Sequence, residues 1–129
     1  MNSEELVAGA VKVRENACAA YSHYKVGATL LAASGKVYTG CNVENSTYGL
    51  TVCAERVALW KALSEGERKF TQIAVVTSSE PPASPCGACR QLLWEFCGDI
   101  EITLANLKGF RKTLRLSEIF PRPFDQSAL

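Results

Sequence analysis

The alternation of apolar and polar positions divides the first third of the chain into a helix and two strands. From Ser3 to about Ala20, apolar residues recur at helical spacing, and Ser3 can serve as the N-cap. The segments "KVGATLLAA" and "KVYTGCNVE" have strand composition and flank Ser34-Gly35, a turn signal of the hairpin kind. We therefore expect an amphipathic helix followed by two antiparallel strands.

Helical and strand patterns alternate through the middle of the chain. The segment "TVCAERVALWKALSEGE" has helical periodicity up to Gly66, with Thr51 available as an N-cap and Cys53 in the first turn. The run "TQIAVVTSS" has the pattern of a buried strand, "PPASP" breaks the chain, and "CGACRQLLWEFC" is again helical. Cys86 and Cys89 therefore lie at the N-terminus of a second helix.

The remaining segments complete a mixed α/β pattern. "EITLANL" and "RKTLRL" flank a turn at Lys108-Gly109 and predict two strands, followed by a short helix near "SEIF". The resulting order, α-β-β-α-β-α-β-β, favours a mixed sheet with helices on both faces. Functional sites in such sheets lie where helix N-termini follow strand ends.

Size and charge limit the possible partners. A chain of 129 residues suits a single domain spanning residues 1–129, and 14 Lys plus Arg against 13 Asp plus Glu give a net charge of only +1. This balance provides no general attraction to nucleic acid or to anionic membranes, and the basic segment "KGFRKTLR" is typical of a solvated hairpin. The first thirteen residues lack the pattern of a secretory signal, and no apolar run is long enough to cross a bilayer. We expect a soluble, cytoplasmic protein that acts on a small molecule.

Six cysteines offer candidate chemistry. The pair Cys86 and Cys89 could be a redox couple, half of a structural zinc site, or two ligands of a catalytic metal. Cys53 is the best third ligand, because it too lies at the start of a helix, where the helix dipole favours thiolate. The other three cysteines fit element patterns and are expected to be small buried apolar residues. His23 could complete a structural Cys3His site, but we favour water as the fourth ligand of a catalytic site.

Glu55 follows Cys53 by two residues and reaches the same metal without having to bind it. A carboxylate in this position can take a proton from metal-bound water. The alternative is an acidic residue in the first turn that only stabilises the helix dipole. Beside Cys53, we favour the catalytic interpretation.

Cys53-Ala54-Glu55 followed by "SPCGACRQ" resembles the zinc-dependent nucleoside deaminases, and among them the small three-cysteine cytidine deaminases. "YSHYKVGA" and "GCNVENSTYGLTVCAERVAL" extend the resemblance over most of the chain. It implies a three-layer α/β/α fold with a central mixed five-stranded sheet, one Zn²⁺ per subunit, and a homotetramer with shared active sites. It also implies hydrolytic deamination of cytidine and 2'-deoxycytidine, with Glu55 as the proton shuttle, in pyrimidine salvage.

The resemblance also assigns substrate contacts. Asn42 and Glu44, two apart on one face of a strand end, would hold the sugar 3'-hydroxyl, although both residue types are also common in turns. The backbone N–H of Ala54 would read the pyrimidine O2. Tyr24 occupies a position that usually carries phenylalanine against the substrate.

Three further residues have an expected role, and two of them also have an alternative. Phe124 would cover the base, and Tyr48 would reach the site of a neighbouring subunit; packing in the core is the alternative for Phe124. Three thiolates on Zn²⁺ leave a formal charge of minus one, so we expect Arg56 to donate hydrogen bonds to the thiolates. A solvent-facing Arg56 is the alternative.

Three rival functions stay open. A deaminase of a cytosine-containing antibiotic such as blasticidin S is the nearest rival, although the Asn42 and Glu44 pair argues against it. A protein with purely structural zinc and a dithiol redox protein are the others. The presence of Glu55 beside Cys53 counts against both.

Overall fold

A computed structural model describes residues 1–129. The helices are α1 (Ser3–Arg14), α2 (Ala54–Ser64), α3 (Gly87–Cys97) and the short α4 (Leu116–Ile119). The strands are β1 (Gly27–Ala32), β2 (Val37–Cys41), β3 (Phe70–Val76), β4 (Glu101–Ala105) and β5 (Arg111–Arg115). Two 3-10 turns, η1 (Tyr48–Leu50) and η2 (Gln126–Ala128), lie in the long loop before α2 and in the tail. None of the helices combines the length and the apolar character that a membrane span requires.

The strands form one mixed five-stranded sheet in the order β2-β1-β3-β4-β5. Strands β3 and β4 are parallel, and all other neighbours are antiparallel. Gly27, the first residue of β1, lies opposite both Cys41 and Val76, the last residues of β2 and β3. The segment before β1 and the segments after β2 and β3 therefore lie together at one end of these strands.

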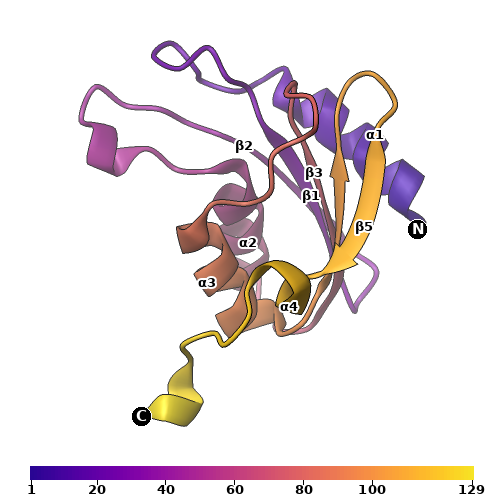
Figure 1. The fold of residues 1–129 in the computed structure, drawn as a ribbon, viewed down its shortest axis with the longest axis vertical. Helices are drawn as coiled ribbons and strands as arrows, with labels where there is room; N and C mark the ends of the chain where they lie inside the picture. Colours follow the sequence, from indigo (N-terminus) through magenta and orange to yellow (C-terminus); the bar gives the residue numbers. More distant parts are fainter.

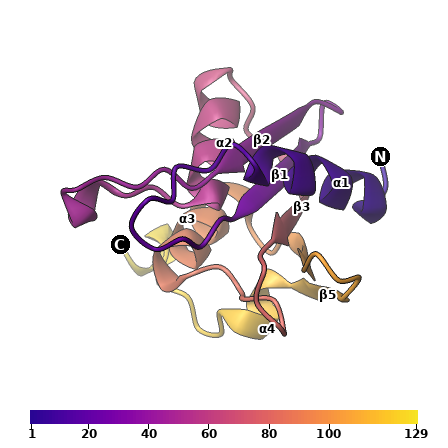
Figure 2. The ribbon, with the colours of Figure 1, turned by 90° about the horizontal axis from the view of Figure 1, so that it is seen from above.

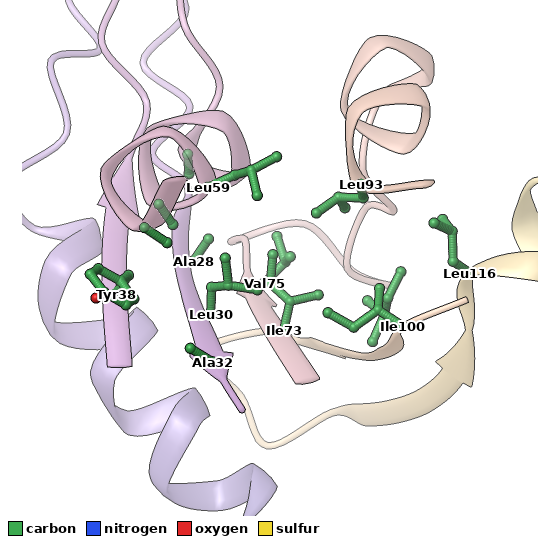
Figure 3. Close-up of a cluster of buried hydrophobic side chains, with 14 of the residues drawn as sticks. Ala28, Leu30, Ala32, Tyr38, Leu59, Ile73, Val75, Leu93, Ile100 and Leu116 are labelled. Carbon is green, nitrogen blue, oxygen red and sulfur yellow. The ribbon is translucent and has the colours of Figure 1, made fainter. Parts of the chain in front are cut away.

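Helices cover both faces of this sheet, as Figures 1 and 2 show from two directions. On one face, α1 buries an apolar cluster with residues of β1, β3 and β4; its members include Leu6, Val7, Leu31 and Val76. On the other face, α2, α3 and α4 bury a larger cluster against the sheet, drawn in Figure 3; its members include Leu30, Leu59, Ile73, Leu93 and Leu116. The predicted three-layer α/β/α architecture is confirmed.

The first helix is shorter than its apolar pattern predicts. It ends at Arg14, whereas the periodicity continues to about Ala20. The backbone of Cys18 instead pairs with the segment after β2: its N–H donates to Asn42 O at 2.9 Å, and its carbonyl accepts from Glu44 N at 2.9 Å. These long-range hydrogen bonds replace the helical ones, and they hold residues 15–26 beside residues 42–44.

Both predicted N-caps are wrong. The side chain of Asn2, not Ser3, caps α1 by accepting from Glu5 N at 2.9 Å. Helix α2 begins at Ala54 with Cys53 as its N-cap, because the Thr51 N–H bonds back to Tyr48 O and closes the preceding 3-10 turn. The cysteine thiol makes no capping hydrogen bond, so the free N–H groups of the first turn stay directed toward the thiol's surroundings.

Helix α2 lies unusually close to β2. A Cβ added at Gly40 would lie 2.4 Å from Ala54 O and 2.6 Å from Ala58 N, which no side chain tolerates. Glycine is required here because the helix backbone passes directly over the strand. This contact fixes the N-terminus of α2 over the end of β2.

Candidate active site

Three cysteine thiols come together where α2 and α3 begin. Cys53 is the N-cap of α2, Cys86 is the N-cap of α3, and Cys89 lies in the first turn of α3 and is fully buried. The Sγ atoms of Cys53 and Cys86 are 3.8 Å apart, and those of Cys86 and Cys89 are 3.5 Å apart. All three sulfur atoms lie within 4.8 Å of one another, and His23 is not part of the cluster.

The surroundings of the cluster favour thiolate. Arg56 Nη2 donates to the Sγ of Cys53 at 3.3 Å, so the guanidinium is directed at the thiol cluster. Hydrogen bonding from the Cys89 thiol, assisted by Arg56, lowers the pKa of Cys53 to about 5. The same hydrogen bond, together with burial, raises the pKa of Cys89. The two helix N-termini add partial positive charge at the same point.

The donor set fits zinc. Zn–S bonds of about 2.3 Å place two thiolates of one tetrahedral zinc about 3.8 Å apart, close to the separations observed here. Three sulfur donors without a fourth protein ligand are typical of a site that leaves one position for water or substrate. Arg56 and the helix dipoles offset the negative charge that three thiolates would leave on the ion.

Glu55 lies in the first turn of α2, is only 5 % exposed, and is not part of the thiol cluster. Burial raises its pKa to about 7, and the neighbouring Cys53 adds to the shift. An acidic residue that only stabilises the helix dipole would be exposed to solvent, so the burial of Glu55 argues against that alternative. A carboxyl group whose pKa lies near neutrality can both accept and donate a proton under ordinary conditions.

Glu55, Cys53 and Cys86 line a cavity of about 230 Å³. Ala54 lines the same cavity, and its backbone N–H belongs to the first turn of α2, where no intrahelical acceptor is available. Tyr24, Asn42 and Glu44, from the segments before β1 and after β2, line it as well. The cavity therefore brings together most of the residues that the sequence assigns to catalysis, metal binding and substrate binding.

Asn42 and Glu44 directly follow the end of β2, and both line this cavity. Asn42 is 7 % exposed and is fixed at both ends of its amide: Oδ1 accepts from Val26 N at 2.8 Å, and Nδ2 donates to Tyr24 O at 2.9 Å. Glu44 accepts from the backbone N–H groups of Tyr21 and Ser22 at 2.9 and 3.0 Å and from the Ser22 hydroxyl. These hydrogen bonds from Ser22 lower the pKa of Glu44 and keep it an acceptor.

Two predicted residues lie outside the cavity of their own chain. Tyr48 is 74 % exposed in the projecting loop before α2, where its ring packs edge-on against Tyr21. Phe124 is 61 % exposed, and its carbonyl accepts from Gln91 Nε2 at 2.7 Å, which holds the tail against α3. The alternative that Phe124 packs in the core is therefore wrong.

Comparison with known proteins places this site in a family. The chain matches the family described as the cytidine and deoxycytidylate deaminase zinc-binding region over residues 1–104. The chain belongs to this deaminase family.

Full-length relatives and solved structures agree with this family. The chain is 48% identical to a cytidine deaminase of Sporosarcina psychrophila over 130 residues, covering 100% of this chain and 96% of the relative. It is 46% identical to a cytidine deaminase of Halalkalibacterium halodurans, covering 96% and 95%. A crystal structure of cytidine deaminase from Burkholderia pseudomallei superimposes with a TM-score of 0.93 at 44% identity, covering 96% of this chain and 100% of that one.

Zinc is the cofactor of this deaminase family member, as its zinc-binding region and its three-cysteine cluster together show. A dithiol redox pair would not need the third thiol or the buried carboxyl group. One expectation about the other cysteines is wrong, because Cys18 is exposed, and Cys41 and Cys97 are only partly buried.

Three further residues shape this deaminase site. Arg90, the basic residue that directly follows Cys89, donates to Pro85 O, Ile119 O and Ser84 Oγ at 2.8 to 2.9 Å, and so holds the loop before Cys86. Ser22 fixes Glu44, and Ser79 bonds to Tyr24. No local sequence pattern marks Ser22 and Ser79, because their partners lie 22 and 55 positions away.

Proposed function

We propose that the chain catalyses the hydrolytic deamination of cytidine and 2'-deoxycytidine to uridine and 2'-deoxyuridine, with release of ammonia. The observation that carries this proposal is the buried Glu55, which lines a cavity together with Cys53 and Cys86 of the three-thiol cluster. Asn42 and Glu44 give the same cavity polar side chains suited to a sugar. Relatives named cytidine deaminase that span nearly the whole chain support the same substrate class.

Cys53, Cys86 and Cys89 hold the zinc ion in this proposal. Bound there, zinc supplies Lewis-acid activation of the attacking water. Glu55 accepts a proton from that water and delivers it to N3 of the cytosine ring. It then carries the second proton to the amino group, which leaves as ammonia as the C4 carbonyl forms. One carboxyl group suffices, because the proton accepted in one step is donated in the next.

Four residues that line the cavity hold the nucleoside in this proposal. The Glu44 carboxylate accepts a hydrogen bond from the sugar 3'-hydroxyl, and Asn42 orients this carboxylate and contributes its amide, with an Nδ2 to Oε2 distance of 3.5 Å. The Ala54 N–H donates to O2 of the base, and the ring of Tyr24 packs against the substrate. The small, partly apolar cavity suits a free nucleoside better than a polynucleotide.

We further propose that residues 1–129 form a single catalytic domain that assembles as a homotetramer with shared active sites. Tyr48 and Phe124 support this arrangement, because both aromatic side chains are exposed and neither lines its own cavity. They would complete the sites of neighbouring subunits. A cytoplasmic role in pyrimidine salvage follows from this activity on free nucleosides, without nucleic acid or membrane partners.

The direct test follows the loss of cytidine absorbance with zinc-loaded protein and with Glu55→Gln. A general acid–base group contributes about 10²- to 10⁴-fold, so kcat should fall by that factor while zinc content stays at wild-type level. Glu5→Gln is a matched control, because Glu5 also lies in the first turn of a helix but far from the cavity. Activity that survives Glu55→Gln, or turnover of blasticidin S in place of cytidine, would contradict the proposal.

A further inference from the structure

A side-chain hydrogen bond joins two segments that border the cavity. Tyr24 Oη and Ser79 Oγ lie 2.8 Å apart, although the residues are 55 positions apart in the sequence. Tyr24 precedes β1 and Ser79 follows β3. The start of β1 is paired with the end of β3, so the two residues lie at the same end of these strands. Tyr24 lines the cavity, whereas Ser79 lies behind it and does not.

Ser79 belongs to a small hydroxyl network that shapes the loop leading to Cys86. Its Oγ lies 3.0 Å from Thr77 Oγ1, and the N–H of Ala83 donates to both oxygens, at 3.1 and 3.2 Å. Either oxygen of each hydroxyl pair can be the donor, so Tyr24 can donate to Ser79 and Ser79 to Thr77. The loop that carries Cys86 into the thiol cluster is thereby fixed to the phenol of Tyr24.

The backbone of Tyr24 is hydrogen-bonded to one of the two residues proposed to hold the sugar and to Ser22, which fixes the other. Its carbonyl accepts from Asn42 Nδ2 at 2.9 Å, and its N–H donates to the hydroxyl of Ser22, which itself bonds to Glu44. Tyr24 therefore bridges the residues proposed to hold the sugar and the loop proposed to carry a zinc ligand. Its aromatic ring lies between these two anchors.

We infer that Ser79 is a positioning residue for nucleoside binding, which acts by holding the phenol of Tyr24 and thereby the spacing between the residues proposed to hold the sugar and the loop that carries Cys86. This inference rests on the proposed function. The hydrogen bond touches neither Glu55 nor the thiols, so its loss changes how the nucleoside is held more than how the proton is moved.

The test measures cytidine kinetics of Tyr24→Phe, Ser79→Ala and the double variant. Tyr24→Phe keeps the ring and removes only the hydroxyl. One neutral hydrogen bond corresponds to a change of about 3- to 10-fold, so KM should rise by that factor in each single variant, with a smaller change in kcat. The double variant should be no worse than the singles, because all three lack the same bond. Ser79→Thr, which keeps the hydroxyl, should restore KM.

A matched control exists at the other end of the sheet. Tyr38 Oη and Ser34 Oγ both donate to Glu67 Oε2, at 3.0 and 2.7 Å, and neither residue lines the cavity. Tyr38→Phe and Ser34→Ala remove the same kinds of group and should leave KM at the wild-type value. A rise in KM in these controls equal to that in Ser79→Ala would show a general effect of instability and overturn the inference.

Calorimetric binding of cytidine to zinc-loaded Glu55→Gln separates this inference from the proposed function. If the wild type deaminates cytidine but KM is unchanged in both single variants, or the two effects add, the inference is wrong and the function stands. If cytidine binds without turnover and Tyr24→Phe weakens binding about 3- to 10-fold, the inference holds although the proposed reaction fails. If cytidine does not bind, both fail.

Discussion

At the scale of single residues, the charged side chain of Arg56 has hydrogen-bond partners for only some of its N–H groups. Its Nη2 donates to the Sγ of Cys53, whereas its Nε is buried without a hydrogen-bond partner. An unpaired buried N–H normally costs about 1–3 kcal/mol. At this position the positive charge of Arg56 offsets the negative charge of three thiolates, which compensates for the unpaired N–H. The contact with Cys53 also raises the pKa of Arg56, so the guanidinium stays charged.

Arg56→Gln should therefore lower zinc affinity and activity. Loss of a group that contacts a metal ligand typically costs about 10- to 100-fold in metal affinity, and we expect a decrease in this range in competition with a chromophoric chelator. Arg68→Gln is the control, because Arg68 Nη1 donates only to the carbonyls of Leu63 and Glu67, near the other end of α2. Unchanged zinc affinity and activity in Arg56→Gln would show that the thiolates need no such compensation.

The sequence predicts residues well where the chemistry is local and poorly where it is not. Cys53, Glu55 and the Cys86/Cys89 pair stand in short motifs whose spacing reflects a helix N-terminus. The structure clusters the three thiols, and Glu55 lines a cavity with two of them, Cys53 and Cys86. The bond between Tyr24 and Ser79 spans 55 positions and leaves no periodicity. The exposure of Cys18 follows from the early end of α1, which apolar spacing alone does not show.

At the scale of elements, two glycines set how closely the helices approach the β1–β2 hairpin. A Cβ at Gly40 would collide with the backbone of α2 at 2.4 Å, and one at Gly27 would collide with Ala10 O of α1 at 2.0 Å. The two helices lie on opposite faces of the sheet. Only the α2 contact lies under residues proposed to bind zinc.

Gly40→Ala should therefore damage both the fold and the site. The added methyl group pushes against Ala54 and Ala58, so we expect a loss of at least about 1–3 kcal/mol in the free energy of unfolding, and weaker zinc binding. Gly27→Ala should destabilise the protein at least as much, but with a smaller effect on zinc affinity in the folded fraction. Denaturant unfolding and chelator competition measure the two effects separately. A folded Gly40→Ala protein with wild-type zinc affinity would show that the α2 contact does not position Cys53.

The sequence predicts the type and order of these elements but not their ends. All five strands and the four helices occur where hydrophobic periodicity and turn residues place them. The ends depend on which carbonyl each backbone N–H bonds to. The N–H of Cys18 donates to Asn42 O, and the N–H of Thr51 donates to Tyr48 O. The bond of Cys18 joins distant segments and forms only once the chain is folded. The two failed caps have local causes, because Asn2 caps α1 in place of Ser3 and Thr51 closes a 3-10 turn.

At the scale of the whole molecule, apolar side chains gather on one exposed surface beside α2. Val43, Val57 and Trp60 line a shallow groove there, and Trp60 is 47 % exposed. The loop that carries Tyr48 and Leu50 projects from the body of the subunit in both views (Figures 1 and 2), and Leu50 is 64 % exposed. Contiguous exposed apolar surface of this kind typically marks a site of association.

Trp60→Glu should therefore disrupt assembly and activity together. A buried, unpaired carboxylate at a subunit contact opposes association, so sedimentation should show wild-type particles about four times the 14.0 kDa subunit and a smaller species for the variant. Activity should fall with assembly, because Tyr48 and Phe124 do not reach the cavity of their own chain. Leu107→Glu is the control, since Leu107 is 49 % exposed but lies outside the groove. A fully active monomer would contradict shared sites, because such a subunit would need no aromatic residue from a neighbour.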